Sequence, residues 1–72
     1  MDIKERMAKR LRDLRGDKDA DAVAKACGIS RSALGMYEIG ARIPRDEVKV
    51  KLANYYHTSV QDIFFKPQGH EA

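Results

Sequence analysis

Residues 20–37, ADAVAKACGISRSALGMY, contain two short helical patterns that meet at a glycine. Two helices that cross at a steep angle need a small residue where they come closest, and Ala24 provides one. The turn between them needs a residue that tolerates a positive φ, and Gly28 meets that need. Leu34 and Tyr37, on the second helix, would then cover the angle between the two helices. This segment therefore predicts a helix-turn-helix.

Short helical patterns continue on both sides of this segment. Before it, apolar residues recur at helical spacing over residues 3–15. Asp19, Ser30 and Ser59 stand where helix N-caps are expected, because their side-chain oxygens can accept hydrogen bonds from free amides of the first turn. No strand pattern appears, so the chain is predicted to be all-α with five short helices. The expected helices begin at about Ile3, Ala20, Arg31, Arg45 and Val60.

The composition is typical of one small soluble domain. The 72 residues are 43% hydrophobic and 35% charged. A domain is expected over residues 1–66, followed by a flexible tail over residues 67–72. No apolar run approaches the roughly 18 residues that a membrane span needs, and the first residues contain no apolar signal core. We therefore expect a cytoplasmic protein without a membrane partner.

Neither metal binding nor catalysis is indicated. Cys27 is the only cysteine and lies in an apolar helical pattern, which favours a small buried side chain over a reactive thiol. Asp17, Asp19 and Asp21 have the alternating spacing of a calcium loop, but the glycine and the closing glutamate of such a loop are missing. We interpret them as turn and cap residues. No metal, cofactor or small-molecule ligand is expected, and the protein is not predicted to be an enzyme.

The charge of the chain favours an anionic partner. The formal net charge is +3 and the pI is about 9.2. Basic residues crowd the segment 4–15, and Arg31, Arg42 and Arg45 flank the middle of the chain. For the first helix, a solvated charged surface is an equally simple interpretation.

A family resemblance rests on RLRDLR at residues 10–15, VAKACGISRSAL at 23–34, YEIGARIP at 37–44 and KLANYYHTSVQDIFF at 51–65. With these motifs the chain resembles the Cro/CI repressor-type, or XRE, family of bacterial and phage helix-turn-helix proteins over residues 10–65. The resemblance implies a lambda-repressor-like fold and binding of double-stranded operator DNA in the bacterial nucleoid. It also implies transcriptional regulation, with repression by a homodimer on a palindromic operator as the expected form.

The chain departs from the family pattern in places. The family usually starts its second helix with a glutamine that contacts the DNA backbone, and this chain has Ala20 there. That loss leaves room for a rival role, a protein-interaction module of the same fold that binds DNA poorly. His57 stands where the family usually has a glycine, and we interpret it as a helix cap in left-handed geometry. The turn between the first two helices is also shorter than is common.

The recognition helix of this family presents the outward residues of its first two turns to the major groove. Because its apolar stripe points inward, the outward residues are Arg31, Ser32, Gly35 and Met36. Arg31 is expected to bond guanine O6 and N7, with a phosphate clamp as the alternative. Ser32 would donate to a base or a phosphate, and Gly35 would allow close approach. Met36 would touch a thymine methyl or simply cover the helix.

Phosphate contacts are expected around this helix, because they position a protein on DNA. Arg42 and Arg45, in the following loop, match places where the family often grips the backbone. Ser30, at the helix N-terminus, would contribute its amide or its hydroxyl. Tyr37 would offer its hydroxyl to a phosphate, with a core ring that keeps a wet tip as the alternative.

Two further expectations concern the scaffold. Arg15 and Glu38 match a pair that in this family often forms an ion bridge between the first and third helices, which would fix the recognition helix. The last helix carries apolar residues on several sides, more than so small a domain is expected to bury, so they are predicted to meet a partner subunit. These predicted dimer residues are Val60, Ile63, Phe64 and Phe65.

Overall fold

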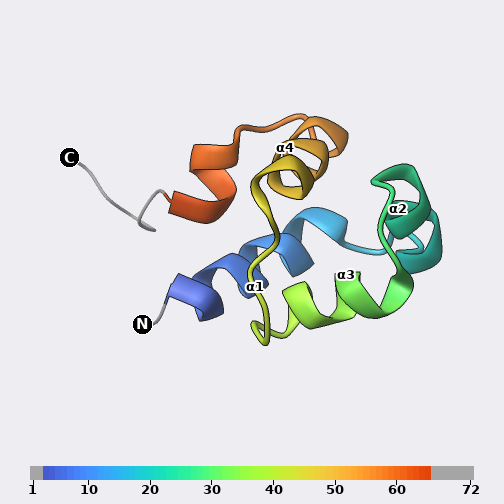
Figure 1. Cartoon of the computed structure of the whole chain (residues 1–72), viewed down its shortest axis with the longest axis horizontal. Helices are drawn as coiled ribbons and strands as arrows, with labels where there is room; N and C mark the ends of the chain where they lie inside the picture. Colours follow the sequence, from blue (N-terminus) through green and yellow to red (C-terminus); the bar gives the residue numbers. More distant parts are fainter. Residues whose placement is uncertain (1–2, 66–72) are drawn as a thin grey trace.

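Five short helices follow one another along the chain (Figure 1). A computed structural model describes residues 3–65. No strand occurs between residues 3 and 65, so the predicted all-α class and the five helices are confirmed. The tail predicted over residues 67–72 lies outside the described residues. The elements are α1 (Ile3–Arg15), α2 (Ala20–Ala26), α3 (Arg31–Glu38), α4 (Asp46–Tyr55) and η1 (Gln61–Phe65).

Side-chain caps fix where several of the helices begin, as the sequence predicted. Asp19 Oδ2 accepts a hydrogen bond of 3.0 Å from the amide of Ala22, which starts α2. Ser30 Oγ accepts one of 3.0 Å from the amide of Ala33, which starts α3. Ser59 caps the last helical turn in the same way. Since these bonds satisfy amides that a helix N-terminus leaves unpaired, the starts of α2 and α3 are set locally.

Left-handed residues turn the chain sharply after α2, α3 and α4. Gly28 has φ 70°, Gly40 has φ 78° and His57 has φ 57°. The amide that follows each of them reaches back to a carbonyl of the last helical turn. After α2, for example, the amide of Ile29 donates to the carbonyl of Ala24 at 2.9 Å. A histidine adopts this conformation at some cost, so the interpretation of His57 as a left-handed cap is confirmed.

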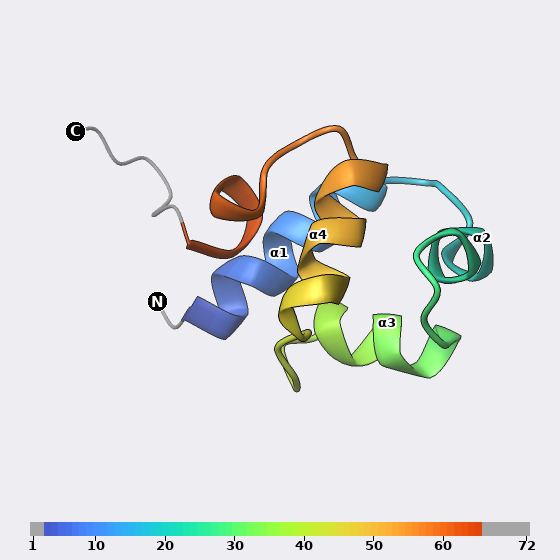
Figure 2. The same cartoon turned by 45° about the horizontal axis from the view of Figure 1, so that its top comes forward.

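The core lies where α1, α2, α3 and α4 converge (Figure 2). Each of these helices contributes a side chain with no exposed surface, namely Leu11, Val23, Leu34 and Leu52. α3 packs against both α1 and α2, while η1 packs against α1. No helix between residues 3 and 65 has the length and apolar character that crossing a membrane requires. With its partners on one side only, α3 keeps its other side on the surface.

The last element, η1, is a π-helical turn rather than the α-helix predicted over residues 60–65. Ile63 and Phe64 lie in the core and are each 4% exposed. Phe65, in contrast, is 53% exposed, and Val60 is partly buried. The expectation that this apolar set exceeds what the domain can bury is therefore wrong for Ile63 and Phe64, because both pack inward beside α1.

Lys49 connects α4 to η1. Its ammonium lies 4.8 Å from the ring centroid of Phe65 and 5.6 Å from that of Phe64, so it faces two aromatic rings. The same ammonium is 3.6 Å from Asp46 Oδ1, and only 12% of the Lys49 side chain is exposed. The contact holds the half-exposed Phe65 ring beside the buried one.

Candidate nucleic-acid interface

The helix-turn-helix is built around the bend at Gly28. Ala24 on α2 and Leu34 on α3 are buried on either side of the bend. Ile29 packs against the same core from within the turn. Ser30 has extended backbone angles, φ −76° and ψ 157°, and directs the chain into α3. The N-terminus of α3 is therefore placed beside α2 by residues that the sequence had singled out.

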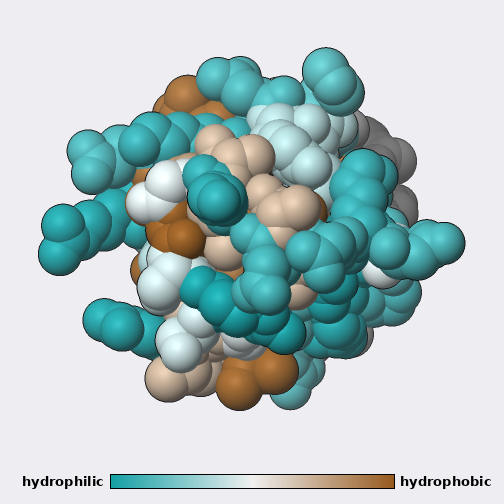
Figure 3. All heavy atoms as spheres, turned by 90° about the vertical axis from the view of Figure 1, so that its right-hand side faces the viewer, coloured by the Kyte–Doolittle hydropathy of each residue, from teal (hydrophilic) through white to brown (hydrophobic). Residues whose placement is uncertain are grey.

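α3 has one buried and one exposed face. Leu34 and Glu38 lie inside the molecule. Arg31, Ser32 and Met36 are exposed, which is the orientation that the sequence predicted. The end of the molecule where α2 and the start of α3 lie is covered mostly by hydrophilic side chains (Figure 3). Such a surface suits a charged, hydrated partner.

The buried face of α3 is fixed to α1 by a two-pronged ion pair. Arg15 Nε lies 2.7 Å from Glu38 Oε2, and Arg15 Nη2 lies 3.0 Å from Glu38 Oε1. The side chains are 24% and 7% exposed, respectively. Arg12 Nη1 donates to the backbone carbonyl of Glu38 at 2.7 Å. The hydrogen bonds that Arg15 donates to Glu38 raise the pKa of Arg15, so the pair stays charged and α3 is held in one position.

Tyr56 lies at the inner side of this pair. Burial raises its pKa to about 12, and the negative charge of Glu38 adds to the shift. Its hydroxyl is buried and makes no hydrogen bond with any residue between 3 and 65.

The exposed face of α3 carries a second, looser ion pair. Arg31 Nε lies 3.9 Å from Asp21 Oδ1 on α2, and the side chains are 54% and 78% exposed. Arg31 Nη1 lies along the helix over Gly35, 3.3 Å from where a β-carbon would stand on that residue. The guanidinium of Arg31 thus rests between α2 and Gly35, with solvent on its other side.

Arg42 and Arg45 come together beside the end of α3. Both are exposed, and they border an open hollow between α3 and the start of α4. Guanidinium groups at the rim of a hollow are suited to bind the oxygens of a phosphate. The carboxylate of Glu47 also lies there and reduces the positive charge. The lining residues are Tyr37, Arg42, Ile43, Arg45, Glu47 and Val48.

The thiol of Cys27 is buried, as the sequence predicted. The residue is 1% exposed, and its Sγ lies 3.9 Å from the carbonyl oxygen of Lys51. Burial raises the pKa of the Cys27 thiol, which keeps it in the neutral form. In the part of the chain that the structure describes, no three potential metal ligands come together.

Sequence reasoning missed two contacts of α3. Arg12 was one of the basic residues of segment 4–15 and had no partner assigned, although it precedes Arg15 by three residues and so lies on the same helix face. Asp21 was interpreted only as one of the turn and cap residues, yet it pairs with Arg31. Spacing along the chain gives no signal for that pair, because the contact depends on the angle at which α2 meets α3.

Comparison with solved structures places this fold among regulators. The clp gene regulator ClgR from Corynebacterium glutamicum superposes with a TM-score of 0.78 at 25% identity, over 88% of this chain and 69% of that one. The restriction-modification controller protein C.AhdI from Aeromonas hydrophila gives 0.76 at 28% identity, over 85% and 96%. The SOS-response transcriptional repressor LexA from Eubacterium rectale gives 0.84 over 96% and 76%, and at 21% identity this likeness concerns the fold alone.

Comparison with curated proteins gives no match. A family model described as a helix-turn-helix domain matches residues 6–63, which include all of α2, α3 and α4 and most of α1 and η1. The structural neighbours and the family model agree with the resemblance seen in the sequence, that of a DNA-binding domain of regulatory proteins. Since the match spans most of its length, this chain belongs to the helix-turn-helix domain family.

Proposed function

We propose that this protein regulates transcription by laying α3 in the major groove of a specific double-stranded DNA sequence. The observation that carries the proposal is the division of α3 into two faces. Arg31, Ser32 and Met36 are exposed on one face, while Leu34 and Glu38 hold the other against the core. A helix braced from beneath can meet base edges without losing its own support. The similar domains of a gene regulator and a controller protein agree with this role.

Arg31 is the residue that we assign to base reading. A guanidinium can bond guanine O6 and N7 together, and that of Arg31 lies on the exposed face of the first turn of α3. Ser32 beside it would donate to a base or a phosphate, and Met36 would contact a thymine methyl. Gly35, without a side chain, lets α3 approach the DNA closely.

Phosphate contacts would come from both ends of α3. Arg42 and Arg45 border the hollow at the C-terminal end of α3, and Tyr37, whose hydroxyl could reach a phosphate there, lines the same hollow. Ser30 would offer its backbone amide at the N-terminal end, since its hydroxyl already caps the helix. Such contacts set the orientation of the protein on DNA and contribute little to the choice of sequence.

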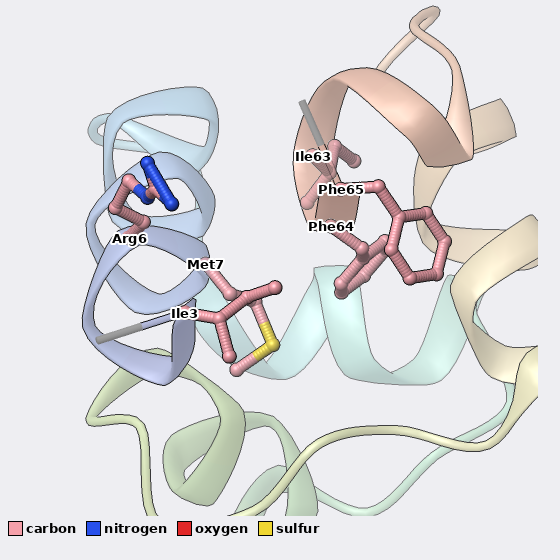
Figure 4. A pocket seen from close by; sticks show the side chains of 6 residues that line it. All are labelled: Ile3, Arg6, Met7, Ile63, Phe64 and Phe65. Carbon is pink, nitrogen blue, oxygen red and sulfur yellow. The ribbon is translucent and has the colours of Figure 1, made fainter. Parts of the chain in front are cut away.

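Repression by a dimer on a palindromic operator is the form of regulation that we propose. Occupying an operator is sufficient to exclude other proteins from it. A second copy would cover the exposed Phe65 and the partly buried Val60, next to Ile3 of α1, which is also exposed. Ile3 and Phe65 border a narrow hollow between α1 and η1, in which Met7 and Phe64 face one another (Figure 4). The two subunits would read half-sites about one helical turn apart.

Selection of bound sequences from randomised duplex DNA tests the proposal. The wild-type chain should enrich one palindromic sequence, and its affinity should fall steeply with salt, because each neutralised phosphate releases counterions. Arg42→Ala should weaken binding to all sequences about equally and reduce the salt slope by about one. Equal, salt-insensitive affinity for every sequence would overturn the proposal in favour of a protein-interaction module.

Two substitutions of Arg31 separate base reading from phosphate binding. Arg31→Ala should cost about 1–3 kcal/mol on the selected site. Arg31→Lys keeps the charge but not the planar fork, so it should retain affinity for random DNA and lose the preference for one base pair. If Arg31→Lys preserves that preference, Arg31 contacts a phosphate instead.

Sedimentation at micromolar concentration, with and without the selected duplex, tests the dimer. Phe65→Ser should leave the monomer folded and shift the equilibrium toward one copy per duplex. A wild-type chain that stays monomeric in both conditions would exclude the dimer and leave DNA binding itself untouched.

A further inference from the structure

An acid of α2 lies beside Arg31 and pairs with it. Ala20, the first residue of α2, is 9% exposed and belongs to the core, so it offers no polar group to α3. The next residue, Asp21, is exposed and brings its carboxylate to 3.9 Å from Arg31 Nε. A carboxylate of α2 is therefore the nearest charged neighbour that the structure gives to the proposed base-reading side chain.

The contact leaves the far edge of the guanidinium open. Asp21 approaches Nε, whereas Nη1 and Nη2 form no hydrogen bond with any residue in the described range 3–65. Nη1 lies 3.3 Å from where a β-carbon on Gly35 would stand, so any side chain there would crowd it. With one edge of the fork directed at Asp21, the edge that carries the two terminal nitrogens is the one left for a ligand.

The two ligands that DNA offers to this edge differ in charge. Guanine presents O6 and N7 as a pair of acceptors without net charge, and a phosphate presents oxygens with a full negative charge. Asp21 repels the phosphate and has little effect on the guanine. A carboxylate next to Arg31 therefore weakens a contact with a phosphate more than a contact with a guanine. Repulsion of the competing ligand in this way creates specificity.

We propose that Asp21 is a positioning residue that determines specificity: by pairing with Arg31 Nε it directs the terminal nitrogens of Arg31 to a guanine and away from phosphates. Gly35 provides the space for this conformation. The inference rests on the proposed function of α3 in DNA binding and adds to it a residue of α2 that touches no base itself. It also assigns a G·C base pair to the half-site position that Arg31 reads.

Asp21→Asn tests this inference, and Asp13→Asn is its matched control. Both remove one negative charge from an exposed side chain in an ion pair, but Asp13 pairs with Lys9 on α1 at 3.0 Å and not with Arg31. Affinities are measured on the selected duplex, on duplexes changed at the base pair that Arg31→Ala identifies, and on random DNA. In Asp21→Asn, discrimination at that base pair should fall about fivefold. This is the factor in an equilibrium constant that corresponds to the interaction energy of two unit charges roughly 4 Å apart in water.

A double substitution tests whether Asp21 acts through Arg31, because a purely structural role of Asp21 would not change the ratio of affinities for different base pairs. If Asp21 acts through Arg31, adding Asp21→Asn to Arg31→Ala should change no discrimination ratio further. Asp13→Asn should raise affinity for all duplexes by a common factor and leave every ratio unchanged. Thermal unfolding of each variant checks that all of them are folded at the temperature of the binding assay.

The outcomes separate the two proposals. Suppose that the wild-type chain selects one sequence but that discrimination falls no more in Asp21→Asn than in Asp13→Asn. This result overturns the role of Asp21 and leaves the proposed function standing. A base pair other than G·C at the position set by Arg31 also overturns it. A wild-type chain that prefers no sequence overturns the proposed function, and the role of Asp21 is overturned with it.

Discussion

Two ion pairs join α3 to neighbouring helices, and they differ in almost every physical respect. Arg15 and Glu38 meet through two hydrogen bonds of 2.7 and 3.0 Å, and Glu38 is 7% exposed. Arg31 and Asp21 meet through a single approach of 3.9 Å, and both side chains are more than half exposed. The inner pair is shielded from solvent, and Arg15 also donates to the carbonyl of Lys18 at 3.0 Å, whereas the outer pair is open to solvent and to a ligand. Similar charges therefore support α3 on one face and, in the function proposed above, read DNA on the other.

The comparison predicts very different costs when each pair is broken, and the largest should be that of Glu38→Gln. Removing one partner of a buried pair leaves an uncompensated charge, which costs about 3 kcal/mol of unfolding free energy, at the low end of the usual range because Arg15 is 24% exposed. Urea unfolding followed by circular dichroism measures it. A loss as small as that expected for a surface pair would mean that the support of α3 lies elsewhere.

The next effect is a loss of stability at high pH that depends on Tyr56. Its folded-state pKa of about 12 lies above the unfolded value of 10. The stability linked to this group is therefore complete below pH 10 and lost as the pH rises to 12, by about 2–3 kcal/mol. Urea unfolding between pH 9 and pH 12 should show the loss in the wild type.

Tyr56→Phe is the control for this loss. It removes a hydroxyl that forms no hydrogen bond within the described residues, so stability at pH 7 should change by less than about 1 kcal/mol. The fall between pH 10 and pH 12 should become smaller by the amount assigned to Tyr56. A variant that follows the wild-type curve would show that the fall does not come from Tyr56.

The supporting face of α3, which carries Leu34 and Glu38, was more predictable from the sequence than the proposed reading face, which carries Arg31, Ser32 and Met36. Helix starts follow from local chemistry, as the caps at Asp19 and Ser30 show, because each bond spans only three residues. The pair of Arg15 and Glu38 was expected from the family resemblance, and the structure contains it. The contact of Asp21 with Arg31 was not predicted, because it depends on the angle at which α2 and α3 cross.

The C-terminal element shows a second limit of the sequence. The spacing of apolar residues predicted a helix at residues 60–65. It gave no information on the π-helical turn or on the space beside α1 that takes up Ile63 and Phe64. Burial in so small a domain depends on tertiary packing. Of the four predicted dimer residues, only the half-exposed Phe65 and the partly buried Val60 keep surface for a partner subunit.

Gly35→Ala should separate stability from recognition on the reading face. Gly35 lies within α3 without a positive φ, so alanine should raise the unfolding free energy by about 0.5–1 kcal/mol through its helix propensity. The new β-carbon would stand 3.3 Å from Arg31 Nη1, and the flexible guanidinium would have to move. We expect a more stable protein with weaker discrimination at the base pair that Arg31 reads. A variant that gains stability and keeps full discrimination would show that this space is not needed.

The smallest effect on stability should be that of Asp21→Asn. The substitution removes an exposed ion pair and an acid from the first turn of α2, where the helix dipole favours negative charge. Each contribution is a few tenths of a kcal/mol, so the unfolding free energy should fall by less than about 0.5 kcal/mol, and 1 M salt should abolish the difference by screening. Glu38→Gln should stay destabilising in the same salt, because its pair is shielded from solvent. If salt removed both effects alike, the two pairs would be equally exposed to water, and the contrast between the two faces of α3 would be lost.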